Sequence, residues 1–426
     1  YPGDRYQAVQ EDKEDVRGEY MGVHEYIVDY IRSGETKGQN LGLEVEHFVI
    51  DDHGFPIGFE EVTELIKEVA SELDAEIIYM DGYPVGYHTP GYSVTLEPSC
   101  QFEISVDPLS DLDEIKAIYQ GFLDLWTPVF AEHGYHLIAK GNLPLVEAGE
   151  IDPDDIPLSH KKRYKYMDAY FRNSGKYGKY MMRASSSVQI SVDYSSEKDL
   201  VRKLLVLQKI SPILMIALEN KSYEDSVIEK GSDKKHLLRM QEWGDLDPSR
   251  TGFYPHSFDS DFGYDKIADV ITHTPLILLT DNGDTTDVGS KTAEDLISEG
   301  VIEKELESPR KEKLIEHFIS MGFFHFRIKK YIEIRVADSV TIERALSYVA
   351  LIKGLIYSEK NLSILEEELA FVNSPSKIQE AVDGIIVSGL DAVIYNEKTA
   401  GEWYKYLVDL ADSSLSPKDQ EYLLNV

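Results

Sequence analysis

In two segments of this chain, a glutamate lies two residues away from another glutamate or from a glutamine. Side chains with this spacing could bind a metal ion together. Glu44 and Glu46 have this spacing in LGLEVEHF, and Gln101 and Glu103 have it in TLEPSCQFEISV. Successive side chains of a β-strand point to opposite faces, so the members of each pair share one face. Like charges on one face repel each other unless a cation lies between them, and Mg²⁺ prefers carboxylate oxygens as ligands. The spacing therefore indicates strands with a metal-binding face.

A third segment, FRIKKYIEIRV, places both signs of charge on one face of a predicted strand. Alternation puts the following side chains together, opposite a mainly apolar row: Arg327, Lys329, Tyr331, Glu333 and Arg335. Arg and Lys side chains stabilise a phosphoryl group during its transfer, and Mg²⁺ neutralises its charge. A basic stripe beside paired carboxylates therefore predicts a site for Mg²⁺ and ATP.

A fourth segment, MMRASSSVQISVD, has the same alternation over a longer run. As one strand it would carry a single polar face, made of Arg183, Ser185, Ser187, Gln189, Ser191 and Asp193. For any one of these strands alone, the competing interpretation is an ordinary antiparallel sheet with one solvent-facing side. The chain has no GxxxxGK(S/T), GxGxxG or GxSxG motif, so ATP would have to be bound on the sheet by metal ions and side chains.

The charge balance limits the partners that this chain can have. Its 426 residues include 77 acidic and 43 basic side chains, which gives a formal charge of −34. This excess repels nucleic acid, anionic membranes and free nucleotide, so an ATP enzyme of this composition needs divalent cations and a local basic strip. A simpler interpretation of most acidic side chains is solvated surface or a salty habitat. The expected partners are small amino acids and ATP, with no nucleic acid and no membrane, for a monomer or homodimer.

Cysteine use and hydropathy exclude further classes of site. Cys100 is the only cysteine, which rules out an intramolecular disulfide and a zinc site built on cysteines. No apolar run reaches the roughly 18 residues of a membrane span, and the first residues lack the apolar core of a signal peptide. These features predict a soluble cytoplasmic protein.

Helices and strands are mixed along the chain without a regular βαβ order. Apolar periodicity predicts helices over residues 21–34, 59–73, 111–133, 197–219 and 291–320. This mixture favours an α+β fold with a mainly antiparallel sheet. We expect residues 1–20 to form a tail, 21–375 one catalytic domain, and 376–426 a helical extension packed on the same domain. The loops 141–180 and 281–292 could cover the site or be ordinary surface loops.

Several segments together resemble the glutamate–cysteine ligase family of the plant and bacterial type, within the glutamine synthetase-like superfamily. In family order they are SGE…LGLEVEHF, TLEPSCQFEIS, KRYKYM, MMRASSSVQISVDY, LLRMQEWGDLDPSRTG, DFGYDKIADV and FRIKKYIEIRVADS, spread over residues 22–370. The resemblance implies a curved, mainly antiparallel sheet whose concave face holds the active site, with helices packed outside. Two places depart from the family pattern: Ser99 and Cys100 replace a glycine pair, and Val336 replaces the glycine of Arg-Gly-Ala-Asp.

The resemblance also implies roles for individual residues. Six resemble metal ligands: Glu44, Glu46, Glu97, Glu103, Gln189 and Glu333. Arg327 and Lys329 would approach the phosphates of ATP, and Arg335 would contact a phosphate or a carboxylate. The candidates for substrate binding are Arg183, Arg239, Arg250 and Tyr331, and no arginine is assigned to a particular carboxylate.

The reaction that the family implies has two steps and uses ATP with Mg²⁺, or with Mn²⁺ in its place. ATP phosphorylates the γ-carboxylate of glutamate, and the amine of cysteine then displaces phosphate to give γ-glutamylcysteine for glutathione-type thiol biosynthesis. Two alternatives stay open: a related ligase that joins another carboxylate or amine, and a non-catalytic nucleotide- or metal-binding sensor with the same fold. The sequence does not decide the amine, the number of metal ions, the oligomeric state, the source of the acidity or the final thiol.

Overall fold

The computed structural model describes residues 22–281, 283–302, 306 and 309–425. The predicted tail, residues 1–20, lies outside these residues, and a helix over residues 22–32 is the first described element. Buried residues of one hydrophobic core run from Val23 to Leu423, on both sides of the predicted boundary after residue 375. The division into a catalytic domain and a C-terminal extension stays a prediction.

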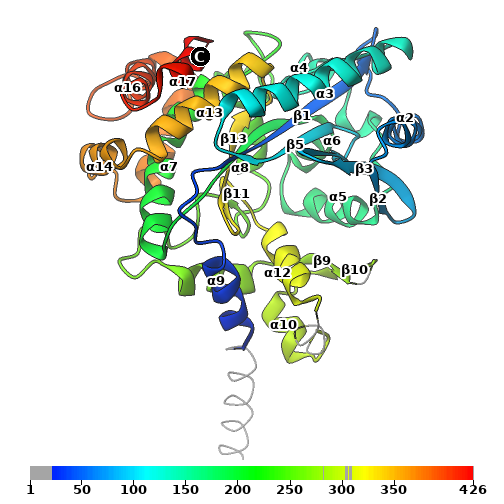
Figure 1. Cartoon of the computed structure of the whole chain (residues 1–426), viewed down its shortest axis with the longest axis horizontal. Coiled ribbons are helices and arrows are strands. Elements are labelled where there is room, and N and C mark those ends of the chain that lie inside the picture. Colours follow the sequence, from blue (N-terminus) through cyan, green and yellow to red (C-terminus); the bar gives the residue numbers. More distant parts are fainter. Residues whose placement is uncertain (1–21, 282, 303–305, 307–308, 426) are drawn as a thin grey trace, which may run out of the picture.

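A mainly antiparallel sheet forms the centre of the molecule (Figure 1). In the described residues it has nine strands: β1 (Leu41–Asp51), β2 (Glu76–Met80), β3 (Tyr83–Thr89), β4 (Tyr92–Leu96), β5 (Phe102–Leu109), β6 (Tyr135–Ile138), β7 (Ser187–Val192), β12 (Phe326–Ile328) and β13 (Ile332–Asp338). Eight of them follow the order β12-β13-β7-β1-β5-β4-β3-β2, and β6 pairs with the second half of β1. Every pair in this sheet is antiparallel, which confirms the predicted α+β class.

The strand register places charged side chains of neighbouring strands on one face of the sheet. Glu44 lies opposite Gln189, and Glu46 lies opposite Glu103. Residues directly opposite each other in antiparallel strands point to the same side. The polar face predicted within each segment is therefore continuous across β5, β1 and β7.

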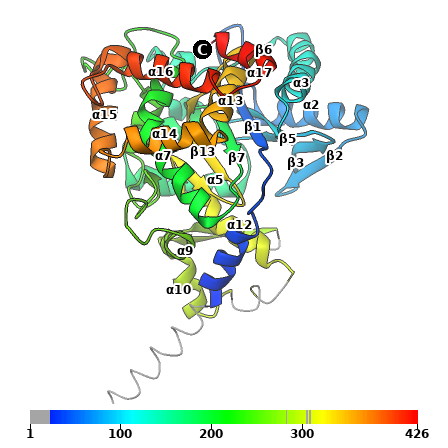
Figure 2. The same ribbon diagram turned by 60° about the vertical axis from the view of Figure 1, so that its left-hand side comes forward.

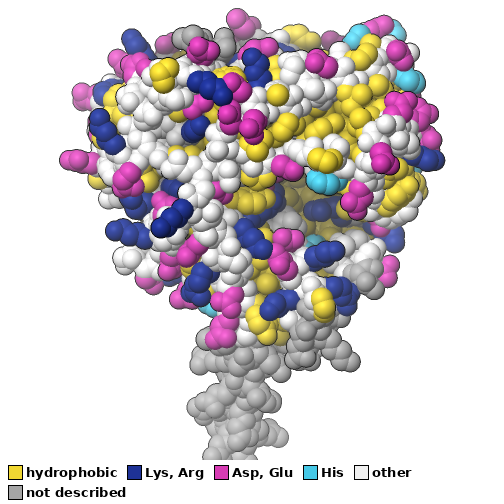
Figure 3. Space-filling view, viewed as in Figure 1, with side chains coloured by type: hydrophobic (Ala, Val, Ile, Leu, Met, Phe, Trp, Pro, Cys, Tyr) yellow, Lys and Arg dark blue, Asp and Glu magenta, His cyan; other side chains and the backbone are white. Residues whose placement is uncertain are grey.

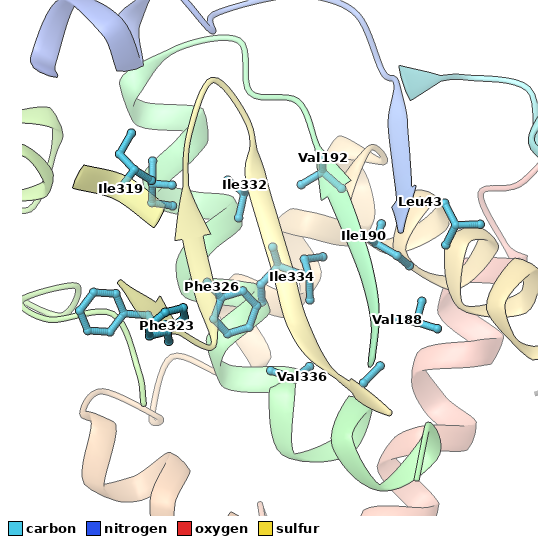
Figure 4. Close-up of a cluster of buried hydrophobic side chains, with 14 of the residues drawn as sticks. Leu43, Val188, Ile190, Val192, Ile319, Phe323, Phe326, Ile332, Ile334 and Val336 are labelled. Atoms are coloured by element: carbon cyan, nitrogen blue, oxygen red, sulfur yellow. The ribbon is translucent and has the colours of Figure 1, made fainter. Parts of the chain in front are cut away.

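The other face of the sheet is apolar and is covered by helices. Figure 4 shows part of it, where Leu43, Ile190 and Ile334 extend from three adjacent strands. All three are 0% exposed, and burial of one such side chain stabilises the fold by about 1.5–3 kcal/mol. Helices that contact the sheet include α2 (Phe59–Glu72), α3 (Leu112–Glu132), α7 (Glu197–Ala217) and α13 (Ile342–Ile356).

Helices α3 and α7 both begin at a residue whose side chain satisfies a free backbone N–H. Asp111 accepts a hydrogen bond from the N–H of Asp113, and Ser196 accepts one from the N–H of Asp199. Such caps stabilise a helix by about 1 kcal/mol each. They fix where two of the covering helices start against the sheet.

The remaining elements lie around this two-layer core. C-terminal helices gather near α7 and α13 (Figure 2), namely α14 (Glu359–Glu368), α15 (Pro375–Ser388), α16 (Ala400–Asp412) and α17 (Pro417–Gln420). The others are α4 (Pro144–Glu147), α5 (Lys162–Ser174), α6 (Gly178–Ala184), α8 (Leu238–Gly244), β8 (Thr251–Gly252), α9 (Tyr264–His273), β9 (Ile277–Asp281), β10 (Asp284–Gly289), α10 (Ala293–Ser298), α12 (Lys311–Ser320) and β11 (Phe323–Phe324). None of the helices in the described part of the chain has the length and hydrophobicity that a membrane crossing requires.

The segment FFHFRIKKYIEIRVAD, predicted as one strand, forms β11 and a hairpin of β12 and β13 instead. The chain turns between β12 and β13, where the N–H of Lys329 donates to the carbonyl oxygen of Tyr331 at 2.8 Å. Arg327 lies directly opposite Glu333 across the hairpin. The predicted common face is still correct, although one strand was predicted where a hairpin forms. Directly opposite residues of neighbouring strands point to the same side of the sheet, as alternate residues of one strand do.

Three other segments also differ from the prediction. The first part of MMRASSSVQISVD is the helix α6, so Arg183 does not lie on the polar face of a strand. The predicted loop 281–292 contains β10, which forms a hairpin with β9. Loop 141–180 contains α4, α5 and the first residues of α6. A short alternating pattern fits helix or strand locally, and packing against the rest of the fold decides between them.

Candidate active site

A pocket of roughly 340 Å³ lies on the polar face of the sheet. Figure 3 shows a hollow near the centre of one face of the molecule, with Lys and Arg side chains at its margin. Strands β1, β5, β7, β12 and β13 supply one side of the pocket, and α5, α8 and β11 supply the other. Ten residues that the sequence predicts for the site line this pocket: Glu44, Glu46, Glu97, Glu103, Gln189, Arg239, Arg327, Lys329, Glu333 and Arg335.

One half of the pocket, formed by β12 and β13, contains a cluster of cations around a single carboxylate. Glu333 is 0% exposed and accepts hydrogen bonds from Arg327 Nε at 2.7 Å, Lys329 Nζ at 2.9 Å and Arg335 Nη1 at 3.0 Å. Burial alone would raise the pKa of Glu333, but these cations hold it well below its usual range. Arg335 also donates to Gln189 Oε1 at 2.7 Å. Three cations around one anion leave positive charge available for phosphate oxygens.

The other half, formed mainly by β1 and β5, contains buried and half-buried carboxylates with no ion pair among the described residues. Burial raises the pKa of Glu46 to about 8, and repulsion from Glu97 adds to the effect. Burial also raises the pKa of Glu103 well above its usual range, with further contributions from Glu97, Glu44 and Glu46. The pKa of Glu44 is raised by burial and then by Glu333. The fold therefore keeps these carboxylates close to one another although their charged forms are destabilised.

Neutral hydrogen-bond donors orient two of these carboxylates. Glu46 Oε2 accepts from the backbone N–H of Ser187 at 2.7 Å, and Glu103 Oε1 accepts from the hydroxyl of Thr95 at 3.1 Å. Neutral donors fix the direction of a carboxylate but do not cancel its charge. The oxygens are thus placed at the pocket and stay available to a cation.

The carboxylate half suits a hard divalent cation by the chemistry of its donors. Mg²⁺ takes carboxylate oxygens, and a cation would offset the burial and the mutual repulsion that raise the pKa values of Glu46 and Glu103. Within the described residues, no three His, Cys, Asp or Glu side chains lie close enough together to hold a metal ion. The predicted ligands therefore supply suitable donors without enclosing a single point in this conformation.

Arg239 on α8 supports the strand that carries Arg335. It is 3% exposed, and its Nη2 donates to the carbonyl oxygens of Arg335 at 3.1 Å and Ala337 at 2.9 Å. Its Nε donates to Asp338 Oδ1 at 3.1 Å. These carbonyls lie at the place where the register of β13 shifts between Ile334 and Ala337. The hydrogen bonds of Arg239 thus stabilise an irregular stretch of strand that directs Arg335 to the pocket.

Several residues that the sequence did not assign to the site line the pocket from outside the sheet. Arg163 and Tyr164 come from α5, Trp243 from α8, and His325 from the segment between β11 and β12. The hydroxyl of Tyr164 donates to Glu97 Oε2 at 3.1 Å. The motif KRYKYM, which carries two of these residues, was a signal that could have found them.

Arg163 stands apart from the other cations of the pocket. Its Nε is buried without a hydrogen-bond partner, and the side chain forms no ion pair within the described residues. A buried donor without a partner costs about 1–3 kcal/mol. Such a group indicates a binding partner that comes from outside the chain.

The sequence profile described as glutamate–cysteine ligase family 2 matches residues 40–421, a span that includes the whole pocket. The chain belongs to this family. It is therefore a ligase enzyme, and the fold described above is that of a glutamate–cysteine ligase family 2 member.

Curated relatives of this family 2 ligase come from plants. Glutamate–cysteine ligase A of Oryza sativa subsp. indica is 27% identical over 350 residues, which cover 80% of this chain and 68% of the relative. Glutamate–cysteine ligase of Medicago truncatula is 28% identical over 340 residues, which cover 79% and 65%. The chain thus spans about two thirds of the length of these relatives.

The crystal structure of glutamate–cysteine ligase from Francisella tularensis in complex with AMP has a similar fold. It superposes with a TM-score of 0.51 at 14% identity and covers 91% of this chain and 81% of its own. The similarity supports the mainly antiparallel fold of this family 2 ligase.

The predicted cytoplasmic location is wrong by this comparison. All eight curated relatives of the ligase are named as chloroplastic enzymes. Absence of an apolar core in the first residues, on which the prediction was based, carries no information about where such enzymes act.

Three residues predicted to bind substrate lie outside the pocket of the ligase. Arg183 forms an ion pair with Asp168, because α6 replaces the expected strand. Arg250 is 0% exposed, donates to Asp247 Oδ2 at 2.8 Å and supports the main chain before β11. Tyr331 lies in the β12–β13 turn, where Lys329 donates to its hydroxyl at 3.3 Å. The structure uses these side chains for packing and turn formation.

Proposed function

We propose that this ligase forms γ-glutamylcysteine from glutamate and cysteine, with ATP as phosphoryl donor and Mg²⁺ as the metal, in glutathione biosynthesis. The observation that carries the proposal is the presence, in one pocket, of a cationic cluster and of buried and half-buried carboxylates that form no ion pair with any other described residue. Nucleotide polyphosphates and divalent cations together satisfy both halves. The names of the plant relatives and the AMP bound to the Francisella enzyme support the same assignment.

The cationic cluster would bind the phosphates of ATP. Arg327, Lys329 and Arg335 already converge on Glu333, so they need little reorganisation when charge develops on the transferred phosphoryl group. Mg²⁺ would be held by the predicted ligands, namely Glu44, Glu46, Glu97, Glu103, Gln189 and Glu333. When bound there, it would neutralise phosphate charge and orient the γ-phosphoryl group, and Mn²⁺ could replace it.

In the first step, an oxygen of the glutamate γ-carboxylate forms a bond to the γ-phosphorus of ATP. The bond from that phosphorus to the bridging oxygen breaks, and ADP leaves with its electron pair. In the second step the amine nitrogen forms a bond to the acyl carbon, and the carbon–oxygen bond to phosphate breaks. The ammonium form of the amine loses two protons overall, one to the departing phosphate and one to solvent.

Arg163 would bind the α-carboxylate of glutamate. Its Nε has no hydrogen-bond partner in the described part of the chain, whereas Arg327, Lys329 and Arg335 are paired with Glu333. Arginine binds carboxylates through two parallel hydrogen bonds, which would fix the position of the γ-carboxylate at the other end of the substrate.

The test is ATP consumption with Mg²⁺ and glutamate, with and without cysteine, and identification of the product by mass spectrometry. Cysteine-dependent turnover that gives γ-glutamylcysteine would establish the reaction. Turnover with a different amine would keep the mechanism and replace the substrate. A folded, Mg²⁺-loaded protein that turns over no carboxylate–amine pair would refute the proposal and favour a non-catalytic sensor.

A further inference from the structure

The turn between β4 and β5 carries Glu97, one of the predicted metal ligands, in the wall of the pocket. Strand alternation does not set the direction of this side chain, because Glu97 follows the last residue of β4. The backbone closes the turn itself: the N–H of Glu97 donates to the carbonyl oxygen of Gln101 at 2.9 Å, and the N–H of Cys100 donates to that of Glu97 at 3.0 Å. We call residues 97–101 the Glu97 turn.

The segment before α5, residues 157–161, is bound to this turn by two neutral hydrogen bonds. The N–H of Ser159 donates to the carbonyl oxygen of Pro98 at 2.7 Å. The hydroxyl of Ser99 donates to the carbonyl oxygen of Pro157 at 3.0 Å, across 58 residues of sequence. The Glu97 turn is therefore held from outside the sheet, by the segment that leads into α5.

Lys161 adds a third contact, and this one is charged. The side chain is 5% exposed, and its Nζ donates to the carbonyl oxygen of Leu96, the residue directly before the Glu97 turn. An ammonium group is costly to bury unless it is paired, and hydrogen bonds from charged donors are stronger than those between neutral groups. The buried ammonium of Lys161 thus fixes the main chain from which Glu97 extends.

Tyr164, in the first turn of α5, connects Lys161 to the carboxylate of Glu97. The Nζ of Lys161 lies 5.2 Å from the centroid of the Tyr164 ring, a distance at which a cation is attracted to an aromatic face. The hydroxyl of Tyr164 donates to Glu97 Oε2 at 3.1 Å. One ammonium group therefore contacts both the backbone that carries Glu97 and the ring that orients its carboxylate.

The charge of Lys161 also acts on the carboxylate half of the pocket. Burial lowers the pKa of Lys161, and the carboxylates of Glu97 and Glu103 oppose this effect. The hydrogen bond of the ammonium goes to a carbonyl oxygen, so the carboxylate oxygens stay available to a metal ion. Lys161 could thus act on the site in two ways, by its charge or by the position that it gives to Glu97.

We propose that Lys161 is a positioning residue for the divalent cation: by holding Leu96 and Tyr164, it directs the carboxylate of Glu97 to the metal site and favours Mg²⁺ over larger cations. The inference rests on the function proposed above, because it needs a divalent cation in the carboxylate half. Mg²⁺ demands near-ideal octahedral geometry, whereas Ca²⁺ accepts a flexible one. A displaced Glu97 should therefore weaken the binding of Mg²⁺ more than that of Ca²⁺.

The test is Lys161→Met, which keeps the length of the side chain and removes its charge. Calorimetric titration of the full chain without substrates measures the Kd values of Mg²⁺ and Ca²⁺. Loss of a group that orients a metal ligand typically weakens binding by about 10–100-fold. We expect the Kd of Mg²⁺ to rise by about tenfold or more and that of Ca²⁺ by about threefold or less.

The two roles of Lys161 predict opposite results in this variant. If the lysine acts by charge alone, its removal leaves the carboxylate half more negative, and both cations bind more tightly. Tighter binding, unchanged Kd values or an equal rise for both cations would each overturn the positioning role.

Lys203→Met is the matched control. Lys203 is 6% exposed, donates to the carbonyl oxygen of Asp193 at 2.9 Å and lies 5.0 Å from the centroid of the Tyr357 ring, but it does not line the pocket. It differs from Lys161 by an ion pair with Asp199. Lys203→Met should lower Tm and leave both Kd values within about twofold. A parallel loss of Mg²⁺ binding in this control would show that the effect of Lys161→Met is general destabilisation.

A double-mutant cycle tests whether Lys161 acts through Glu97. In a Glu97→Gln background, Lys161→Met should change the Kd of Mg²⁺ by less than about twofold, because the ligand that it positions is already lost. An equal effect in both backgrounds would contradict the proposal. If Lys161→Met does not fold, Tyr164→Phe keeps the ring and removes only the hydroxyl that donates to Glu97. The same selective rise in the Kd of Mg²⁺ is then expected, and unchanged values would overturn the proposal.

Failure of the proposed function gives a different result. A wild-type chain that binds neither cation and consumes no ATP would refute the metal site, and with it both proposals. A wild-type chain that binds Mg²⁺ and forms the amide, together with unchanged Kd values in Lys161→Met, would refute the role of Lys161 alone.

Discussion

The two halves of the active-site pocket lie on one face of one sheet, but they differ in how their carboxylates are paired with cations. In the β12–β13 half, Glu333 is fully buried with a pKa well below its usual range, because three cations contact it. In the β1–β5 half, Glu103 is also buried and Glu46 is half-buried, and burial followed by repulsion from Glu97 raises their pKa values, since no ion pair among the described residues offsets these effects. Burial alone therefore does not decide the charge state. The cationic half is preorganised by its own ion pairs, whereas the carboxylate half needs positive charge from outside the chain.

The largest effect that would test this contrast is expected from Glu46→Gln. It removes one anionic oxygen from the carboxylate half, so binding of a divalent cation should fail and ATP turnover should fall by more than about 10³-fold. The metal-free variant should be at least as stable as the wild type, since it no longer buries a repelled carboxylate. Steady-state turnover and thermal denaturation measure the two effects, and retained turnover would remove Glu46 from the metal site.

The next effect concerns the cationic half. Arg335→Ala deletes a preorganised donor, and kcat should fall by about 10²–10³-fold, as when an oxyanion donor is lost elsewhere. Arg335→Lys keeps the charge but loses the pair of directed bonds to Gln189 and Glu333, so it should recover only part of the rate. Near-normal kinetics in Arg335→Ala would show that the cluster is structural.

A smaller effect should come from the support behind Arg335. Asp338→Asn weakens the bond that orients Arg239, and kcat should fall by about tenfold with little change in the KM for glutamate. Asp247→Asn is the matched control, because Asp247 pairs with the buried Arg250 outside the pocket. If Arg239 binds substrate instead, the KM for glutamate will rise in Arg239→Lys while Asp338→Asn stays near normal.

The smallest expected effect is a pH dependence of stability in the carboxylate half. The pKa of Glu46 is raised from 4.5 to about 8, so the folded state binds its proton more tightly than the unfolded state. The stability gained from this group is complete below pH 4.5 and is lost as the pH rises through 8. Without metal, Tm should fall on the order of 5 °C between these limits. Saturating Mg²⁺ should restore Tm at pH 8, and Glu46→Gln should flatten the profile; an identical slope in that variant would contradict the assignment.

Much of the polar face could be predicted from the sequence. The alternation in LGLEVEHF and FRIKKYIEIRV put Glu44 with Glu46 and Arg327 with Arg335, and each of these residues lines the pocket. The predicted face is correct despite the unexpected hairpin between β12 and β13, because both alternation and cross-strand pairing follow from local strand geometry. The same reasoning failed for Arg183, since a helix fits the alternating segment there and packs against η1 (Pro153–Asp155) and α5.

Sequence by itself determined which side chains share a face of each strand, and therefore the sheet type and most of the pocket's chemical groups. Tertiary structure alone decided which charges are compensated, because partners such as Gln189 and Arg335 are 146 residues apart. It also decided that Arg163, Trp243 and His325 complete the pocket from α5, α8 and the β11–β12 segment. The physical reason is that side-chain alternation is set by neighbouring backbone angles, whereas pKa values and ion pairs depend on distance and burial across the whole fold.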